Sequence, residues 1–206
     1  MKSAPIFAIL GLAFAAALSA PAPLLAQDTP SKQELLDALK GKSGGPRTRA
    51  LIVADPKKQG QEQALIKSLQ GRTTRAITVE ERTQVAEIAK DKPGVDLEIY
   101  FAYDSAAIER ESLPSLTNLG QALTDGALKD SIFLVGGHTD GRGSNEYNLH
   151  LSERRADSVR AFLVHTFKID PNRLIAVGYG EENLKNAANP EDGVNRRVQI
   201  VNLATK

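Results

Sequence analysis

The hydrophobic pattern is most regular in the second half of the chain, where it predicts strands that alternate with long helices. Residues 95–101 (VDLEIYF) alternate apolar and polar side chains with the period of two that is typical of a half-buried strand. Leucines recur at helical spacing over residues 113–123, and the glycine-bounded apolar run SIFLVGGHT predicts a central strand. Residues 152–167 show helical spacing again, and two further predicted strands follow them, LIAVGYG and NRRVQIVNL.

This order of elements predicts an α/β fold of the α+β sandwich type. Strands that alternate with long helices favour β-α-β units, in which the connecting helices pack on the sheet. We therefore expect a β-α-β-α-β-β order over residues 95–206, with a mixed four-stranded sheet and helices on one face. A helical or flexible extension is expected to precede this domain.

Residues 27–94 are less regular and predict an N-terminal extension that is partly helical or disordered. The segments SKQELLDALKG and TVEERTQVAEIAKDKPG each open with a Ser/Thr-x-x-Glu capping box and end at a glycine, so each predicts a short helix. GQEQALIKSLQG predicts another helix, and ALIVADP predicts a brief strand. Because the extension is poor in large apolar residues, we expect it to have little core of its own.

Residues 1–26 are typical of a secretory signal peptide. The basic start MK precedes an uncharged apolar run over residues 6–18, and small residues and prolines follow. The apolar run is shorter than the ~20 residues that a bilayer-spanning helix needs. We expect cleavage after Ala26, export to the periplasm and no transmembrane segment in the mature chain. The alternative is a retained N-terminal anchor.

Composition narrows the classes of function. The chain contains no cysteine, which excludes disulfides, a thiol nucleophile and the acylated cysteine of lipoproteins. A formal net charge of +1 argues against nucleic-acid binding by phosphate neutralisation. The three histidines show no metal-ligand spacing such as H-E-x-x-H, so neither a metal nor a cofactor is predicted.

Candidate binding chemistry is concentrated in residues 136–156, GGHTDGRGSNEYNLHLSERRA. With Ser152 as the helix N-cap, Arg154 and Arg155 would lie in the first turn, where the helix dipole disfavours each cation by ~0.3–1 kcal/mol. Guanidinium groups beside free backbone N–H groups are suited to binding a carboxylate or a phosphate. The alternative is that both arginines are solvated or pair with nearby glutamates.

Asp140 directly follows the predicted central strand, at the entrance to a Gly-Arg-Gly turn. A loop of about eleven residues would let Asp140 and the arginines converge on one cleft. There the two charges could pair, or, if held apart, they could bind the ammonium and the carboxylate of a zwitterion. The alternative for Asp140 is an Asx-turn that only caps the loop.

A hydrolase is the enzyme alternative, because His138, Asp140 and Ser144 lie close together in the sequence. No strained nucleophile turn such as G-x-S-x-G surrounds the serine. Successive side chains of a strand point to opposite faces, so His138 and Asp140 would share a face while Ser144 lies on a loop. We therefore expect a protein that is not an enzyme.

The motif G-H-T-D-x-x-G-x-x-x-Y-N-x-x-L-S-x-x-R-A, with NRRV near the end, resembles the OmpA-like C-terminal domain. This peptidoglycan-binding module is shared by outer-membrane protein A, the peptidoglycan-associated lipoprotein and the flagellar stator protein MotB. The resemblance runs from about Val95 to Leu203 and includes F-x-x-D-S-A at residues 101–106. It implies non-covalent binding of the diaminopimelate in the peptide stem of peptidoglycan, and with it support of the cell envelope from the periplasm.

The resemblance also implies roles for individual residues. Asp140 would hold the amine of diaminopimelate and Arg155 its carboxylate. Asn148, Leu151 and the Thr139 backbone would line the same pocket. Arg154 matches no position of the family pattern and is expected on the surface.

Two features depart from the relatives. Ala102 stands where many of them have an aspartate, so a contact through that carboxylate would be lost and a main-chain contact would remain. The chain also has neither the N-terminal barrel nor the lipid-bearing cysteine that tie relatives to the outer membrane. This motivates an alternative function, an envelope adaptor whose residues 27–94 dock a protein partner.

Overall fold

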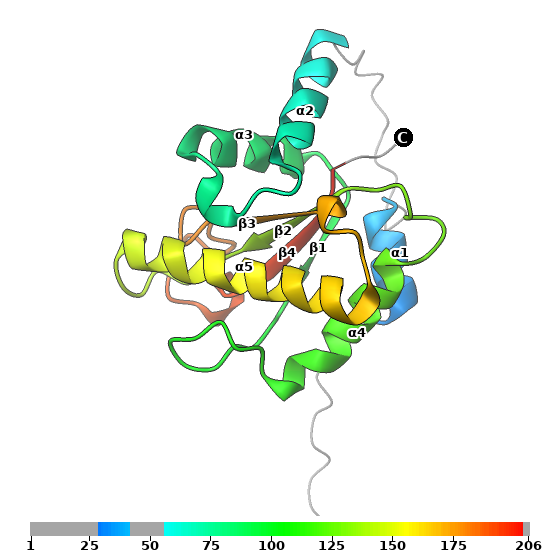
Figure 1. Ribbon diagram of the computed structural model, residues 1–206. Coiled ribbons are helices and arrows are strands. Elements are labelled where there is room, and N and C mark those ends of the chain that lie inside the picture. Colours follow the sequence, from blue (N-terminus) through cyan, green and yellow to red (C-terminus); the bar gives the residue numbers. More distant parts are fainter. Residues whose placement is uncertain (1–28, 42–55, 204–206) are drawn as a thin grey trace, which may run out of the picture.

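The structure is a computed structural model that describes residues 29–41 and 56–203 (Figure 1). The predicted signal peptide and residues 50–55 of the predicted strand ALIVADP lie outside the described residues. The α-helices are α1 (Lys32–Leu39), α2 (Pro56–Leu69), α3 (Val79–Lys90), α4 (Leu113–Leu123) and α5 (Asn145–Phe167). Short 3-10 helices are η1 (Thr74–Ala76), η2 (Arg110–Ser112), η3 (Pro171–Arg173) and η4 (Gly193–Asn195).

The four strands of the described residues form one mixed sheet. They are β1 (Gly94–Leu97), β2 (Phe133–Gly137), β3 (Leu174–Gly178) and β4 (Val198–Asn202), in the spatial order β1-β4-β2-β3. β2 and β3 are parallel, and β4 runs antiparallel to both of its neighbours. The predicted fold class and the β-α-β-α-β-β order of the domain are thereby confirmed. The first strand is shorter than its alternating pattern predicted, since only a bridge between Phe101 and Ile108 continues the pairing.

The first face of the sheet carries the main core. Figure 1 shows α5 lying across the sheet with α4 beside it, and α1 lies against α4. Phe133 and Val135 of β2 point into this core, where the fully buried Leu119, Val159 and Leu163 of the two long helices meet them. The predicted helical spacing therefore places Leu116, Leu119 and Leu123 in this core, whereas Leu113 at the start of α4 is exposed.

The second face of the sheet is also covered by helices, which corrects the expectation of helices on one face. Leu134, Ile175 and Val177 alternate with the residues of the first core and point the opposite way, where Leu69 of α2 and Val85 of α3 pack on them. The reason is visible in the strands themselves. β2 and β3 are buried along their whole length, so both of their faces need an apolar partner.

The extension therefore contributes to both cores instead of lying apart. The capping boxes predicted at Ser31 and Thr78 are present, and they begin α1 and α3. Leu35 and Leu39 of α1 are fully buried in the first core, and the backbone oxygen of Leu39 accepts a hydrogen bond from the Asn202 side chain at 3.1 Å. The domain boundaries at 26/27 and 94/95 stay a prediction.

We predict that Leu39→Ala lowers the free energy of unfolding by about 2–5 kcal/mol, because it removes a fully buried side chain from the first core. Urea unfolding followed by circular dichroism measures this. Leu113→Ala is the matched control, since Leu113 is 39% exposed at the start of α4 and its truncation costs less than about 1 kcal/mol. Equal stability of Leu39→Ala and the native chain would mean that α1 does not pack on the domain.

Candidate ligand-binding site

Two glycines bring the start of α5 against the ends of β2 and β3. A Cβ atom at Gly137 would lie 2.4 Å from the backbone oxygen of Ser152, and one at Gly178 would lie 2.5 Å from the backbone nitrogen of Glu153. Any side chain at these positions would push the helix away from the sheet. The close approach places the first turns of α5 directly beside the turn that follows β2.

Helix α5 begins eight residues earlier than the sequence predicted. Its N-cap is Ser144, whose hydroxyl accepts a hydrogen bond from the Tyr147 backbone at 3.2 Å, and Ser152 is an interior residue. The connection from β2 is correspondingly shorter than eleven residues. Arg154 and Arg155 therefore lie in the third turn, so the argument from a misplaced cation at the helix dipole was wrong. The motif itself still brings Arg155 to the site.

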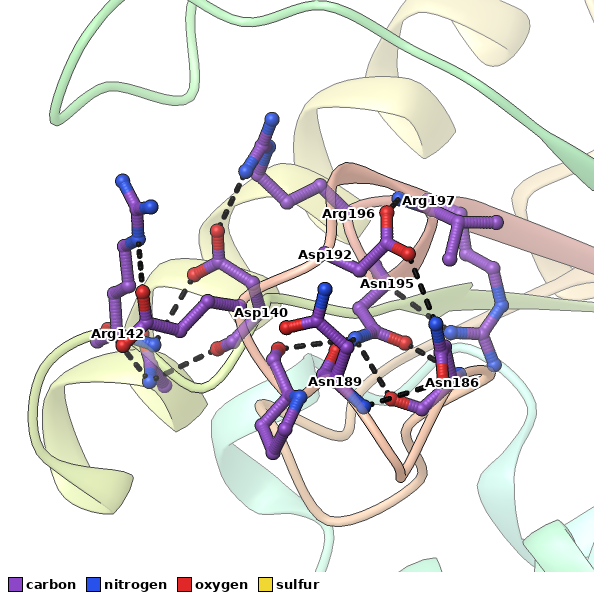
Figure 2. A network of polar contacts seen from close by, with 12 residues as sticks. Asp140, Arg142, Asn186, Asn189, Asp192, Asn195, Arg196 and Arg197 are labelled. Atoms are coloured by element: carbon purple, nitrogen blue, oxygen red, sulfur yellow. Dashed lines mark hydrogen bonds and ion pairs between the residues drawn. The ribbon is translucent and has the colours of Figure 1, made fainter.

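Asp140 is largely buried in the turn after β2, where two donors hold its carboxylate. The Arg142 backbone donates to Oδ1 at 3.2 Å, which is the Asx-turn named above as the alternative. Arg196 donates from Nη1 to Oδ2 at 2.6 Å, and Figure 2 shows this ion pair. The Asp140 side chain is 10% exposed and that of Arg196 is 52% exposed. The carboxylate is thus fixed in place, with Arg196 on its solvent side.

Arg155 is fixed by contacts that leave its outer nitrogens available. Its Nε donates to the backbone oxygen of Ser105 at 3.1 Å, and its guanidinium carbon lies 4.9 Å from the centre of the Phe101 ring. Neither Nη atom makes a hydrogen bond or an ion pair within the described part of the chain. Burial lowers the pKa of Arg155, and Arg196 lowers it further, whereas Tyr147 and, more weakly, Asp140 raise it. Asp140 and Arg155 therefore influence each other without pairing.

The other three predicted residues, Asn148, Leu151 and Thr139, are buried and not exposed to solvent. Asn148 is buried, and its amide donates to the backbone oxygens of Asp140 (3.3 Å) and Arg142 (3.0 Å) and to the Glu181 carboxylate (2.5 Å). Leu151 is buried on the same helix, one turn further on. Thr139 is buried as well, and its backbone N–H donates to Gly180 at 2.9 Å. The structure thus brings all five predicted residues to the turn after β2 and the first turns of α5.

The loop before β4 supplies a structural element that the sequence analysis did not identify. Asn195 is completely buried, and its amide nitrogen donates to the backbone oxygens of Asn189 and Pro190 at 3.1 and 2.9 Å. Its side-chain oxygen accepts from the Asn186 backbone at 2.8 Å. Pro190 in turn accepts a hydrogen bond from Gly141 at 2.8 Å. Figure 2 shows that this network anchors the loop beside the Asp140 turn.

Arg196 is a residue beside Asp140 that the sequence analysis did not single out. It belongs to the NRRV motif, which was a visible signal, but it lies 56 residues from Asp140 in the chain. Periodicity does not indicate which arginine of that motif faces the aspartate. Arg154, in contrast, is exposed as predicted.

The residues of the hydrolase alternative are not assembled into a catalytic group. The His138 ring stacks on Tyr179, with centroids 5.1 Å apart and an interplanar angle of 21°. Burial lowers the pKa of His138 to about 3, and Arg197 acts in the same direction. Asp140 pairs with Arg196, and the Ser144 hydroxyl caps α5.

Across residues 29–41 and 56–203, no helix is both long enough and apolar enough to cross a membrane. The same residues contain no group of three or more His, Cys, Asp or Glu side chains that could hold a metal ion.

The comparisons with known proteins give the family of this domain. Residues 100–197 match the OmpA family, so this domain of the chain belongs to that family, as its motif indicated. Outer membrane porin F of Pseudomonas aeruginosa is 35% identical over 117 residues, which cover 56% of this chain and 32% of the porin. The peptidoglycan-associated lipoprotein of Legionella pneumophila is 35% identical over 108 residues, which cover 52% of this chain and 60% of the lipoprotein.

These two curated relatives are matched over 32% and 60% of their own lengths, so the similarity concerns the domain and not the whole proteins. Among solved structures, the peptidoglycan-associated lipoprotein from Burkholderia pseudomallei is 30% identical. The match covers 50% of this chain and 86% of that chain, with a TM-score of 0.42.

We predict that His138 stays uncharged down to about pH 4, because burial disfavours the imidazolium. In the unfolded chain its pKa returns to the ordinary value of about 6.5. The unfolded state then binds more protons than the folded state between these values, so stability falls as the pH drops from about 6.5 toward 3. The ring-proton chemical shift of His138, followed by NMR from pH 8 to pH 4, should stay constant. A titration midpoint near pH 6.5 would contradict the burial of this ring.

Proposed function

We propose that this protein binds peptidoglycan non-covalently, through the diaminopimelate of the stem peptide, and so supports the cell envelope from the periplasm. The observation that carries the proposal is the arrangement of Asp140 and Arg155, which are both fixed by neighbours but are not paired with each other. The family of the domain supports the same class of function. Two relatives of the domain bear the name peptidoglycan-associated lipoprotein.

The charges of the site suit one amino-acid centre. The side-chain end of diaminopimelate carries an ammonium and a carboxylate on the same carbon, whereas lysine carries an ammonium alone. Asp140 would accept hydrogen bonds from the ammonium, since each carboxylate oxygen can accept more than the one bond it has here. The two Nη atoms of Arg155 would bind the carboxylate in the bidentate manner typical of guanidinium groups.

The proposed site does not use Ala102. The Ala102 backbone N–H donates to Ala107 at 3.0 Å, and its carbonyl oxygen accepts from Ser105 at 3.1 Å. Both main-chain groups are therefore engaged within the loop that also holds Arg155. Since alanine offers no carboxylate, the binding energy is assigned to Asp140 and Arg155.

We assign the protein to the binding proteins and not to the enzymes, because His138 is buried against Tyr179 and its pKa is lowered to about 3, which makes it a weak base near neutral pH. An adaptor function is the second candidate. A groove of about 660 Å³ lies between α2 and α3, with Leu65 and Ile88 among its lining residues, and it is the surface of the extension that a protein partner would use.

We predict that Arg155→Ala and Asp140→Ala each weaken binding of a diaminopimelate-containing stem peptide by about tenfold to a hundredfold. Each change removes a charge-assisted interaction of ~1.5–3 kcal/mol. Isothermal titration calorimetry on the purified mature chain measures the affinity, and a pull-down with isolated sacculi tests binding to the intact wall.

Arg154→Ala is the matched control, because Arg154 is the exposed neighbour of Arg155 on the same helix. It should bind like the native chain. A stem peptide with lysine in place of diaminopimelate should bind more weakly to the native chain by a similar factor. Equal affinity for both peptides, or unchanged binding by Arg155→Ala, would refute the site, and release of soluble muropeptides from sacculi would refute the non-enzymatic class.

A further inference from the structure

A cavity of about 350 Å³ shares Arg196 with the proposed zwitterion site. Its charged lining residues are Lys185, Arg196, Arg197, Asp96 and the exposed Glu98, and Gly193 lines it as well. Arg196 contacts Asp140 with one nitrogen and lines this cavity with the rest of its side chain. Arg196 therefore borders both the cavity and the proposed zwitterion site.

The guanidinium of Arg196 is only partly used by the protein. Nη1 binds Asp140, whereas Nη2 and Nε make no hydrogen bond or ion pair to other described residues. A Cβ atom at Gly193 would lie 3.1 Å from Nη2, so the guanidinium rests on a backbone position that has no side chain. Burial of Asn195 fixes the adjacent backbone. The Arg196 side chain is thus held in place and half exposed to solvent, and its guanidinium has N–H donors that no described residue uses.

Cations outnumber the carboxylates that pair with them around Arg196. In the cavity, Asp96 pairs with both Lys185 at 2.9 Å and Arg197 at 3.4 Å. On the other side, Arg196 pairs with Asp140, and its charge adds by repulsion to the lowering of the pKa of Arg155 that burial causes. A zwitterion brings one positive and one negative charge and does not relieve this repulsion. A ligand with a second carboxylate would relieve the repulsion between Arg155 and Arg196.

We propose that Arg196 is a third ligand-binding residue, which binds a free terminal carboxylate of the stem peptide as the peptide continues beyond diaminopimelate into the cavity. This inference rests on the proposed function, since it places the ammonium of diaminopimelate on Asp140. It specifies the ligand as a stem peptide whose terminal carboxylate is neither amidated nor used in a cross-link.

The test compares two tetrapeptide stems that contain diaminopimelate and end in D-alanine, one as the free acid and one as the carboxamide. Calorimetry with the mature chain gives the ratio of the two affinities. The native chain should bind the acid about fivefold more tightly, a modest factor because a half-exposed ion pair is screened by solvent. Arg196→Gln should bring the ratio to about one, whatever the change in absolute affinity.

Arg142→Gln is the matched control. Arg142 also lies beside Asp140, but its guanidinium is engaged by Glu191 at 3.2 Å, so its removal should leave the ratio near five. Arg196→Lys keeps the charge and serves as a second variant if Arg196→Gln does not fold; it should retain part of the preference.

Equal affinity of the native chain for acid and amide would overturn the inference, as would a preference for the acid that persists in Arg196→Gln. In either case the proposed function stands if Arg155→Ala still loses binding to both peptides. If Arg155→Ala binds both peptides like the native chain, the proposed function itself fails.

Discussion

The ion pair between Asp140 and Arg196 is the interaction on which the site depends. A buried carboxylate needs a counter-charge, and Arg196 provides one from the loop before β4 at 2.6 Å. Arg155 is therefore not needed to neutralise Asp140, and its Nε instead binds Ser105 while its ring contact is with Phe101. The result is a carboxylate and a guanidinium that are both held in place and both able to take a ligand.

The packing of the domain positions the elements that carry these two charges. Glycine at the end of β2 and β3 lets α5 lie against the sheet, so the helix that carries Arg155 is positioned by the same strands that lead into the Asp140 turn. Helices of the extension cover the second face of those strands. Since β2 and β3 have apolar side chains on both faces, residues N-terminal to the family match are part of what keeps the strands of the site in place.

The fold was largely predictable from local pattern, whereas the site was predictable only in part. The alternation in VDLEIYF and the leucine spacing determine which faces are buried, and the capping boxes at Ser31 and Thr78 mark helix starts. The start of α5 was misassigned because Ser144 and Ser152 are both good N-caps, and only the packing on the glycines distinguishes them. Arg196 could not be identified because its partner is 56 residues away, and local periodicity contains no information about such a pair.

The most direct test of the central claim is a crystal structure of the mature chain with a tripeptide stem that ends in diaminopimelate. We predict that the ammonium at the side-chain end lies within about 3 Å of the Asp140 carboxylate, and that the carboxylate on the same carbon accepts two hydrogen bonds from the Nη atoms of Arg155. The contacts of Arg155 with Ser105 and Phe101 should remain as they are in the absence of ligand. A peptide bound elsewhere, or an Arg155 side chain that pairs with Asp140 in the complex, would contradict the account.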